Sequence, residues 1–187
     1  MVYVSSMTRF ARVFGLACAL VAFAEPVLAG CSDFAQPGVN WRRCSQDGQD
    51  LRQADLTGAT VRDASFQRAD LSGAILTDAD ARRAKFISAE MQNVVLDRAN
   101  LVRADLTNAN LPGASLKDAD LTWTKLFAAN LSGADFTGAR LAETDLHRAV
   151  LDDAIWIDGK TICAKGSVGQ CHPDRTRRDI SETDPRS

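Results

Sequence analysis

Two histidines are the side chains best suited to acid–base chemistry near neutral pH, and they lie apart in this 187-residue sequence. His147 lies two residues after Asp145, and His172 comes directly after Cys171. Neither histidine is accompanied by a nucleophile elbow, a phosphate-binding loop or an HExxH zinc motif. Because catalysis needs several converging groups, we expect no enzyme activity, no catalytic or metal site and no cofactor.

The cysteines carry redox chemistry, and four of the five stand in two pairs. Cys31 and Cys44 precede the middle of the chain, and Cys163 and Cys171 follow it. Pairing neighbours is the simplest of the three possible connectivities, and each bridge would contribute roughly 2 to 3 kcal/mol. Free thiols are the alternative, whereas neither pair has the close CxxC spacing of a zinc site.

The first 29 residues have the pattern of a secretory signal peptide. Arg9 and Arg12 precede an uncharged apolar run over residues 13–24, VFGLACALVAFA, which is short for a membrane span. Cleavage after Ala24 or after Ala29 would satisfy the small-residue rule. We therefore expect an exported protein, periplasmic or secreted, in a compartment where disulfides form.

A second interpretation of this region involves the stretch Leu28-Ala29-Gly30-Cys31, which resembles the lipobox of bacterial lipoproteins. Lipidation of Cys31 would place the protein on a membrane surface. Glu25 and Pro26 interrupt the apolar run where such signals stay hydrophobic, and lipidation would leave one cysteine unpaired. We favour the disulfide and keep the lipid anchor as the alternative.

The middle of the chain repeats the same chemistry every five residues. Its composition, with 45% hydrophobic and 25% charged residues and a net charge of −2, is that of a soluble domain. In a helix, five residues advance about 500 degrees, so leucines at this spacing would not form one stripe. In a continuous strand, an odd spacing would point successive leucines to opposite faces. The pattern fits only a chain that bends once in each repeat.

Each quintet has a small position, a ladder position, a central position and two corner positions, as in Ala104-Asp105-Leu106-Thr107-Asn108. The small and central residues would point inward, and the ladder residue between them would face water. Central positions run from Trp41 to Trp156 without an insertion, which makes 24 consecutive quintets. Glycine at the second corner position, as at Gly113, suits a bend.

The motif A-[DN]-L-x-x, as in Ala104-Asp105-Leu106 and Ala119-Asp120-Leu121, resembles the pentapeptide repeat family over residues 39–158. The resemblance implies an all-β fold, a right-handed quadrilateral β-helix with four repeats per turn. The 24 quintets would then form about six coils, a rod roughly 29 Å long if each coil rises about 4.8 Å.

A stacked solenoid exposes unpaired hydrogen-bonding groups at both ends, so it needs caps. The cysteine pairs are placed to staple an N-terminal cap segment over residues 30–38 and a C-terminal cap over residues 159–172. Residues 173–187 are polar and highly charged, and we expect them to form a disordered tail.

Residues twenty apart would stack on the surface of such a rod, and this register gathers arginines. The candidate binding strip consists of Arg42, Arg62, Arg82, Arg83 and Arg103. It could bind an anionic envelope component or a protein, although a solvated face with Asp63 and Asp80 nearby is the alternative. Trp123 and Phe127 occupy positions expected to face water and are candidate apolar contacts.

We therefore expect an exported, non-catalytic bacterial scaffold, monomeric, that mediates protein or cell-envelope interactions, with membrane contact only if lipidated. The family suggests one alternative, because some members resemble B-form DNA and modulate DNA gyrase. That role requires cytoplasmic residence and a strongly anionic rod. Residues 39–158 hold 18 acidic and 14 basic side chains, a net charge of −4, and include the arginine strip. We do not expect nucleic acid as a partner.

Overall fold

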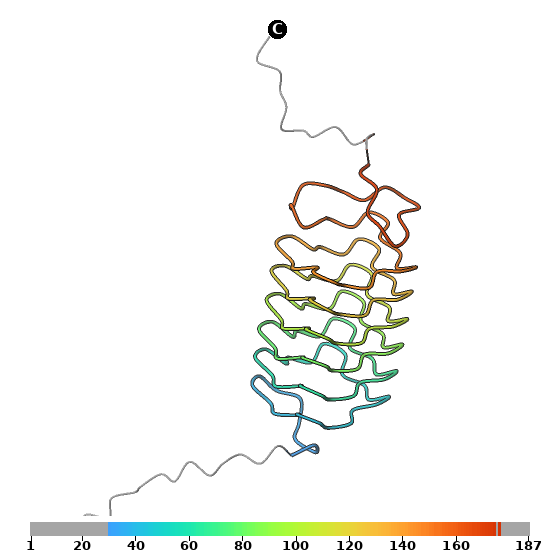
Figure 1. The fold of residues 1–187 in the computed structure, drawn as a ribbon. Coiled ribbons are helices and arrows are strands. Elements are labelled where there is room, and N and C mark those ends of the chain that lie inside the picture. Colours follow the sequence, from blue (N-terminus) through green and yellow to red (C-terminus); the bar gives the residue numbers. More distant parts are fainter. Residues whose placement is uncertain (1–29, 175, 177–187) are drawn as a thin grey trace, which may run out of the picture.

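The computed structural model describes residues 30–174 and residue 176, which wind into a right-handed quadrilateral β-helix. Its coils stack along one axis, from the N-terminal end in blue to the C-terminal end in red (Figure 1). The predicted signal peptide and nearly all of the predicted tail lie outside the described residues. None of the described residues forms a helix that is long and apolar enough to cross a membrane.

Parallel β-bridges hold the coils together. They join each ladder residue to the one twenty positions later, from Asn40 with Thr60 to Asp135 with Ile155. Each side of a coil contributes one isolated bridge instead of an extended strand, because a turn follows every quintet. The spacing of twenty residues equals four quintets, so the predicted β-helix with four repeats per turn is confirmed.

A tight turn forms each corner. The N–H of Ala104 donates to the carbonyl of Leu101 at 2.8 Å, and the second corner residue between them, Arg103, has a φ of 59°. A positive φ is what a type II turn requires at its third residue. Among the described residues, seventeen that are not glycine have a positive φ, and all of them stand at this corner position. Gly113 reaches the same conformation without a Cβ, as expected.

Over five successive residues, such as 105–109, backbone carbonyls accept hydrogen bonds from four of the five N–H groups. Three N–H groups, those of Asp105, Leu106 and Asn108, bond to carbonyls of the adjacent coils at 2.8 to 2.9 Å. The N–H of Ala109 closes the turn onto Leu106 at 3.0 Å. The remaining N–H, that of Thr107, donates to Oδ1 of Asp105 at 3.1 Å. Aspartate or asparagine recurs at the ladder position because its side chain supplies this last acceptor.

The core is a set of columns inside the coils. Leu106 and Leu126 are fully buried in one column, as predicted, and the rings of Phe66 and Phe86 in the same column stack with centroids 5.1 Å apart. The small residue that precedes each central residue by two positions, such as Ala104 before Leu106, is buried as well. Burial of aliphatic side chains therefore stabilises every coil in the same way.

The N-terminal end is closed by residues 30–38 and the first coil. Cys31 forms a disulfide with Cys44, and Gln46 donates from Nε2 to the carbonyl of Cys31 at 3.0 Å. Trp41, 2% exposed, donates from Nε1 to the carbonyl of Asp33 at 3.2 Å. The polar atoms of these two unusual central residues thus hold the cap over the hydrophobic column.

The C-terminal cap is an irregular antiparallel segment stapled by the Cys163–Cys171 disulfide. The sequence predicts that the tail begins at Pro173, but the structure differs. Pro173 bridges to Cys163, and the N–H of Asp174 donates to the carbonyl of Ile162 at 2.9 Å. These backbone pairs extend the cap to Asp174.

The C-terminal cap covers only part of the last coil. The N–H groups of Leu151 and Trp156 donate to cap carbonyls at 2.8 Å. The equivalent N–H groups of Leu141 and Leu146 have no hydrogen-bond partner among the described residues, and both side chains are half-buried. Within residues 30–174, the β-helix therefore ends in an edge with unpaired N–H groups on two of its four sides.

The open edge predicts unequal hydrogen exchange. The amides of Leu141 and Leu146 should exchange much faster than those of Leu121 and Leu126, which donate one coil lower to carbonyls at 2.9 and 2.8 Å. Residue-resolved hydrogen exchange by NMR would measure this. Equal protection of the four amides would show that the edge is covered in solution.

The disulfides should stabilise the two ends separately. Replacing Cys31 and Cys44, which are 13 positions apart, with serine should cost about 3 kcal/mol by the chain-entropy model. Replacing Cys163 and Cys171, which are 8 positions apart, should cost about 2.5 kcal/mol. Denaturant unfolding of both double variants tests this, and unchanged midpoints would contradict it.

Candidate functional site

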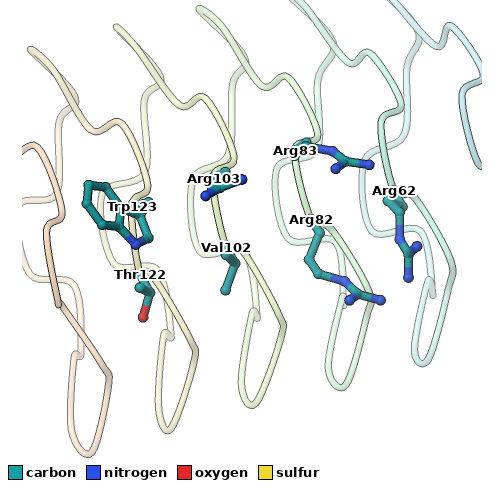
Figure 2. A pocket seen from close by; sticks show the side chains of 7 residues that line it. All are labelled: Arg62, Arg82, Arg83, Val102, Arg103, Thr122 and Trp123. Carbon is teal, nitrogen blue, oxygen red and sulfur yellow. The ribbon is translucent and has the colours of Figure 1, made fainter.

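A shallow groove runs along one corner of the β-helix, across four successive coils (Figure 2). Its volume is about 380 Å³, and its lining residues are Arg62, Arg82, Arg83, Val102, Arg103, Thr122 and Trp123. The groove thus brings together four of the five arginines of the predicted strip and one of the two predicted apolar contacts. Arg42, one coil below Arg62, and Phe127, on the next corner, do not line it.

The twenty-residue register builds the groove. Residues 62, 82, 102 and 122 are first corner residues of successive coils, and residues 83, 103 and 123 are second corner residues beside them. Corner side chains point away from the core, so they lie next to one another along the rod (Figure 2). Trp123 stands at one end, next to Arg103, and the smaller Val102 and Thr122 lie beside these two side chains.

Asp80 binds two of the guanidinium groups. Arg82 donates to its two carboxylate oxygens at 2.7 Å each, and Arg62 donates to Oδ2 at 3.1 Å. These hydrogen bonds, chiefly those from Arg82, lower the pKa of Asp80 to about 2. The buried Nε of Arg62 has no hydrogen-bond partner among the described residues. One donor at the lower end of the groove is therefore unsatisfied.

Arg83 forms a second ion pair, with Asp63 one coil below. Its Nε and a terminal nitrogen reach the two carboxylate oxygens at 2.6 and 2.9 Å, a bidentate arrangement. Hydrogen bonding from Arg83 lowers the pKa of Asp63. Both carboxylates are therefore ionised at neutral pH.

The arginines outnumber these carboxylates. The side chain of Arg103 makes no ion pair or hydrogen bond with any described residue. The four lining arginines and the two aspartates bound to them sum to a formal charge of +2. Asp120, which accepts from the lining Thr122, is balanced by Arg140 at 3.8 Å. The predicted alternative of a solvated face balanced by Asp63 and Asp80 thus describes its lower part, but not the part around Arg103.

Trp123 gives the groove an apolar wall. Its side chain lies on the surface, and the residue is 54% exposed. Its backbone is fixed by a corner φ of 61° and by a hydrogen bond from its N–H to the carbonyl of Ala142 at 2.9 Å. Trp123 is thus a rigidly mounted, accessible ring.

Phe127 is in a different environment. It is half-buried, its ring centroid is 5.7 Å from that of His147, and the guanidinium carbon of Arg148 lies 5.7 Å from the ring centroid. The predicted solvent-facing contact therefore packs within a cluster of its own. His147 contributes to this packing on the exposed surface, far along the chain from the cap residue His172.

The guanidinium groups of the groove can recognise negative charge. No group of three or more histidine, cysteine or acidic side chains within the described part of the chain could hold a metal ion. Sequence reasoning identified the arginines and Trp123 but missed Val102 and Thr122, whose only signal is their position in the register.

Comparison with solved structures finds other proteins with this repeat. The chain is 36% identical to the pentapeptide repeat protein Rfr23 from the cyanobacterium Cyanothece 51142, over 49% of this chain and 63% of that one, with a TM-score of 0.49. This alignment therefore spans less than two thirds of Rfr23.

Two further solved structures share less sequence. A pentapeptide repeat protein from the Arabidopsis thaliana thylakoid lumen is 28% identical, over 66% of this chain and 84% of that one, with a TM-score of 0.42. QnrB1, a plasmid-mediated fluoroquinolone resistance protein, is 18% identical, over 70% of this chain and 83% of that one, with a TM-score of 0.43.

A search of curated protein sequences returned no match. The model of the family described as pentapeptide repeats matches eight copies, in segments 50–86, 64–101, 89–126 and 129–155. These segments cover more than half of the chain and follow the same quintets that form the coils. The chain therefore belongs to the pentapeptide repeat family.

Proposed function

We propose that this protein is an exported, non-catalytic scaffold that binds an anionic component of the cell envelope through the arginine groove. The observation that carries the proposal is the excess of guanidinium groups, with Arg103 unpaired at the centre of the groove. Like charges held close together oppose folding, so a fixed positive groove is better accounted for by a ligand than by stability.

The disulfides support the location. Two disulfides are compatible with a compartment outside the cytoplasm, where such bonds persist. In the lipoprotein alternative, the lipid is attached to the sulfur atom of Cys31. That atom is bonded to the sulfur of Cys44, so a lipid anchor would require loss of the disulfide. Disulfide formation therefore favours a protein without a lipid at Cys31.

The DNA-mimic role remains the rival proposal. A DNA mimic needs rows of negative charge, and the corner that forms the groove carries the opposite charge. It would also act in the cytoplasm, where the thiols would be kept reduced. Location and disulfide state therefore distinguish the two functions.

Cell fractionation of the native host and intact-mass measurement test the location. We expect a periplasmic or secreted form that lacks residues 1–24 or 1–29 and is four hydrogens lighter than its fully reduced chain. A cytosolic, uncleaved and reduced chain would contradict export and favour the gyrase-modulating role. A diacylated N-terminus at Cys31 would establish the lipid anchor instead.

Charge reversal at the groove tests the binding. The full chain should co-sediment with isolated envelopes at low salt, and Arg103→Glu should abolish this because it removes the unpaired cation. Arg68→Glu is a matched control, since Arg68 is exposed, has a φ of 55° against 59° for Arg103, and lies on another corner. Equal loss in both variants would show that only overall charge matters and would refute the groove as the site.

A further inference from the structure

We infer that the ligand of the arginine groove is an acidic polysaccharide, with Trp123 stacked on a sugar ring and Arg103 bound to a neighbouring carboxylate. This inference rests on the proposed function, because it assigns a chemical class to the ligand of the same groove. It depends on three features: the repeat distance of the groove, the exposed indole and the spacing of the charges.

The repeat distance suits a linear polymer. Arg83, Arg103 and Trp123 occupy the same corner position in three successive coils, whose backbones lie about 4.8 Å apart in a β-ladder. Figure 2 shows these side chains following one another along the rod. An extended chain of 1,4-linked pyranoses has units of similar length, so each unit can meet the side chain of one coil.

The exposed indole favours sugars over simple polyanions. A pyranose has one face made of C–H groups, and this face can pack on an aromatic ring while the hydroxyls stay in water. Trp123 offers such a ring at the end of the groove, 54% exposed and on a fixed backbone. A polyphosphate has no apolar face and would leave this ring unused.

The charges favour a carboxylated polymer over a densely charged polyanion such as polyphosphate. Asp63 and Asp80 already bind the guanidinium groups of the lower coils, so the formal charge of the groove is only +2 over four coils. Arg103 is free to bind a carboxylate with two parallel hydrogen bonds, the arrangement for which a planar guanidinium is suited.

Single-stranded nucleic acid also combines negative charge with flat rings, but it fits this corner less well. Proteins that bind it without sequence preference usually stack successive bases on several aromatic side chains. The equivalent second corner residues in the column of Trp123 are Arg43, Asp63, Arg83, Arg103 and Glu143. Only one base could therefore stack on this column.

Fluorescence titration of the full disulfide-bonded chain tests the inference. The probes are polygalacturonate, a carboxylated glycan, together with neutral dextran, inorganic polyphosphate and oligo-dT. Trp41 is buried and Trp156 half-buried, so a ligand in the groove should change chiefly the emission of Trp123. We expect saturable binding of polygalacturonate, weakened by salt, with no comparable binding of dextran.

Three variants locate the contacts. Trp123→Ala and Arg103→Ala should each weaken polygalacturonate binding by roughly tenfold, as loss of a central contact does. Trp123→Phe should recover part of the affinity, because it keeps a ring. Arg68→Ala, which removes the same charge from another corner, should leave the affinity unchanged. Binding by these variants is followed by calorimetry, and their melting temperatures confirm that each is folded.

The outcomes separate this inference from the proposed function. Polyphosphate or oligo-dT could bind more tightly than polygalacturonate, with an affinity that Trp123→Ala leaves unchanged. That result would overturn the assignment of a glycan ligand but leave an anion-binding groove. Equal binding of dextran would overturn the role of Arg103 and its carboxylate. If none of the anionic probes binds and the envelopes do not retain the protein, both proposals fail.

Discussion

The corner turn is the constraint on which the rest of this structure depends. One residue in each quintet takes a positive φ, and the carbonyl of the central residue closes the turn. Most of these residues carry a Cβ, so a conformation that L-residues adopt rarely is repeated along the whole rod. The ladder hydrogen bonds and buried columns hold each corner in place. Since the turns recur every five residues, side chains twenty apart meet, and the groove follows from that register.

Periodicity was sufficient to predict a chain that bends once in each of 24 quintets, and the resemblance to the pentapeptide repeat family implied the β-helix with four repeats per turn. The periodicity separates inward from outward positions, but it does not show what an outward side chain binds. The role of Asp105 as acceptor for the N–H of Thr107 was therefore invisible until the corner geometry was known. The cap posed the opposite problem. Its backbone is irregular, so no repeat signals that Pro173 and Asp174 pair with it or that Leu141 and Leu146 are left at an open edge.

The same distinction applies to the groove. The register predicted that the arginines would stack, and four of them line one groove. It could not predict the ion pairs, because a long side chain can reach several neighbours on its own coil and on the next. Arg82 and Arg62 meet at Asp80, whereas Arg83 reaches down to Asp63. Trp123 and Phe127 looked equivalent in sequence, yet His147 and Arg148 pack against only Phe127. Such differences arise from contacts between side chains of neighbouring columns. The twenty-residue register relates only residues of the same column, so it does not predict these contacts.

A fold of this kind separates stability from recognition. Its hydrogen bonds are made by the backbone and the ladder residues, and its burial is supplied by the central and small residues. Most corner side chains take part in neither, and the exceptions include Asp47, Asp97 and Asp152, which each accept a hydrogen bond from a backbone N–H. The chemistry of most corner positions can therefore vary with little effect on the coils. Elsewhere on the rod, Arg98 is neutralised by Asp78 twenty residues away, whereas Arg43 and Arg68 form no ion pair with any described residue. Arg103 follows the same register but lies above Arg83, a like charge, and beside an exposed indole. The fold does not need this arrangement, and a ligand bearing a carboxylate and an apolar face would satisfy both side chains.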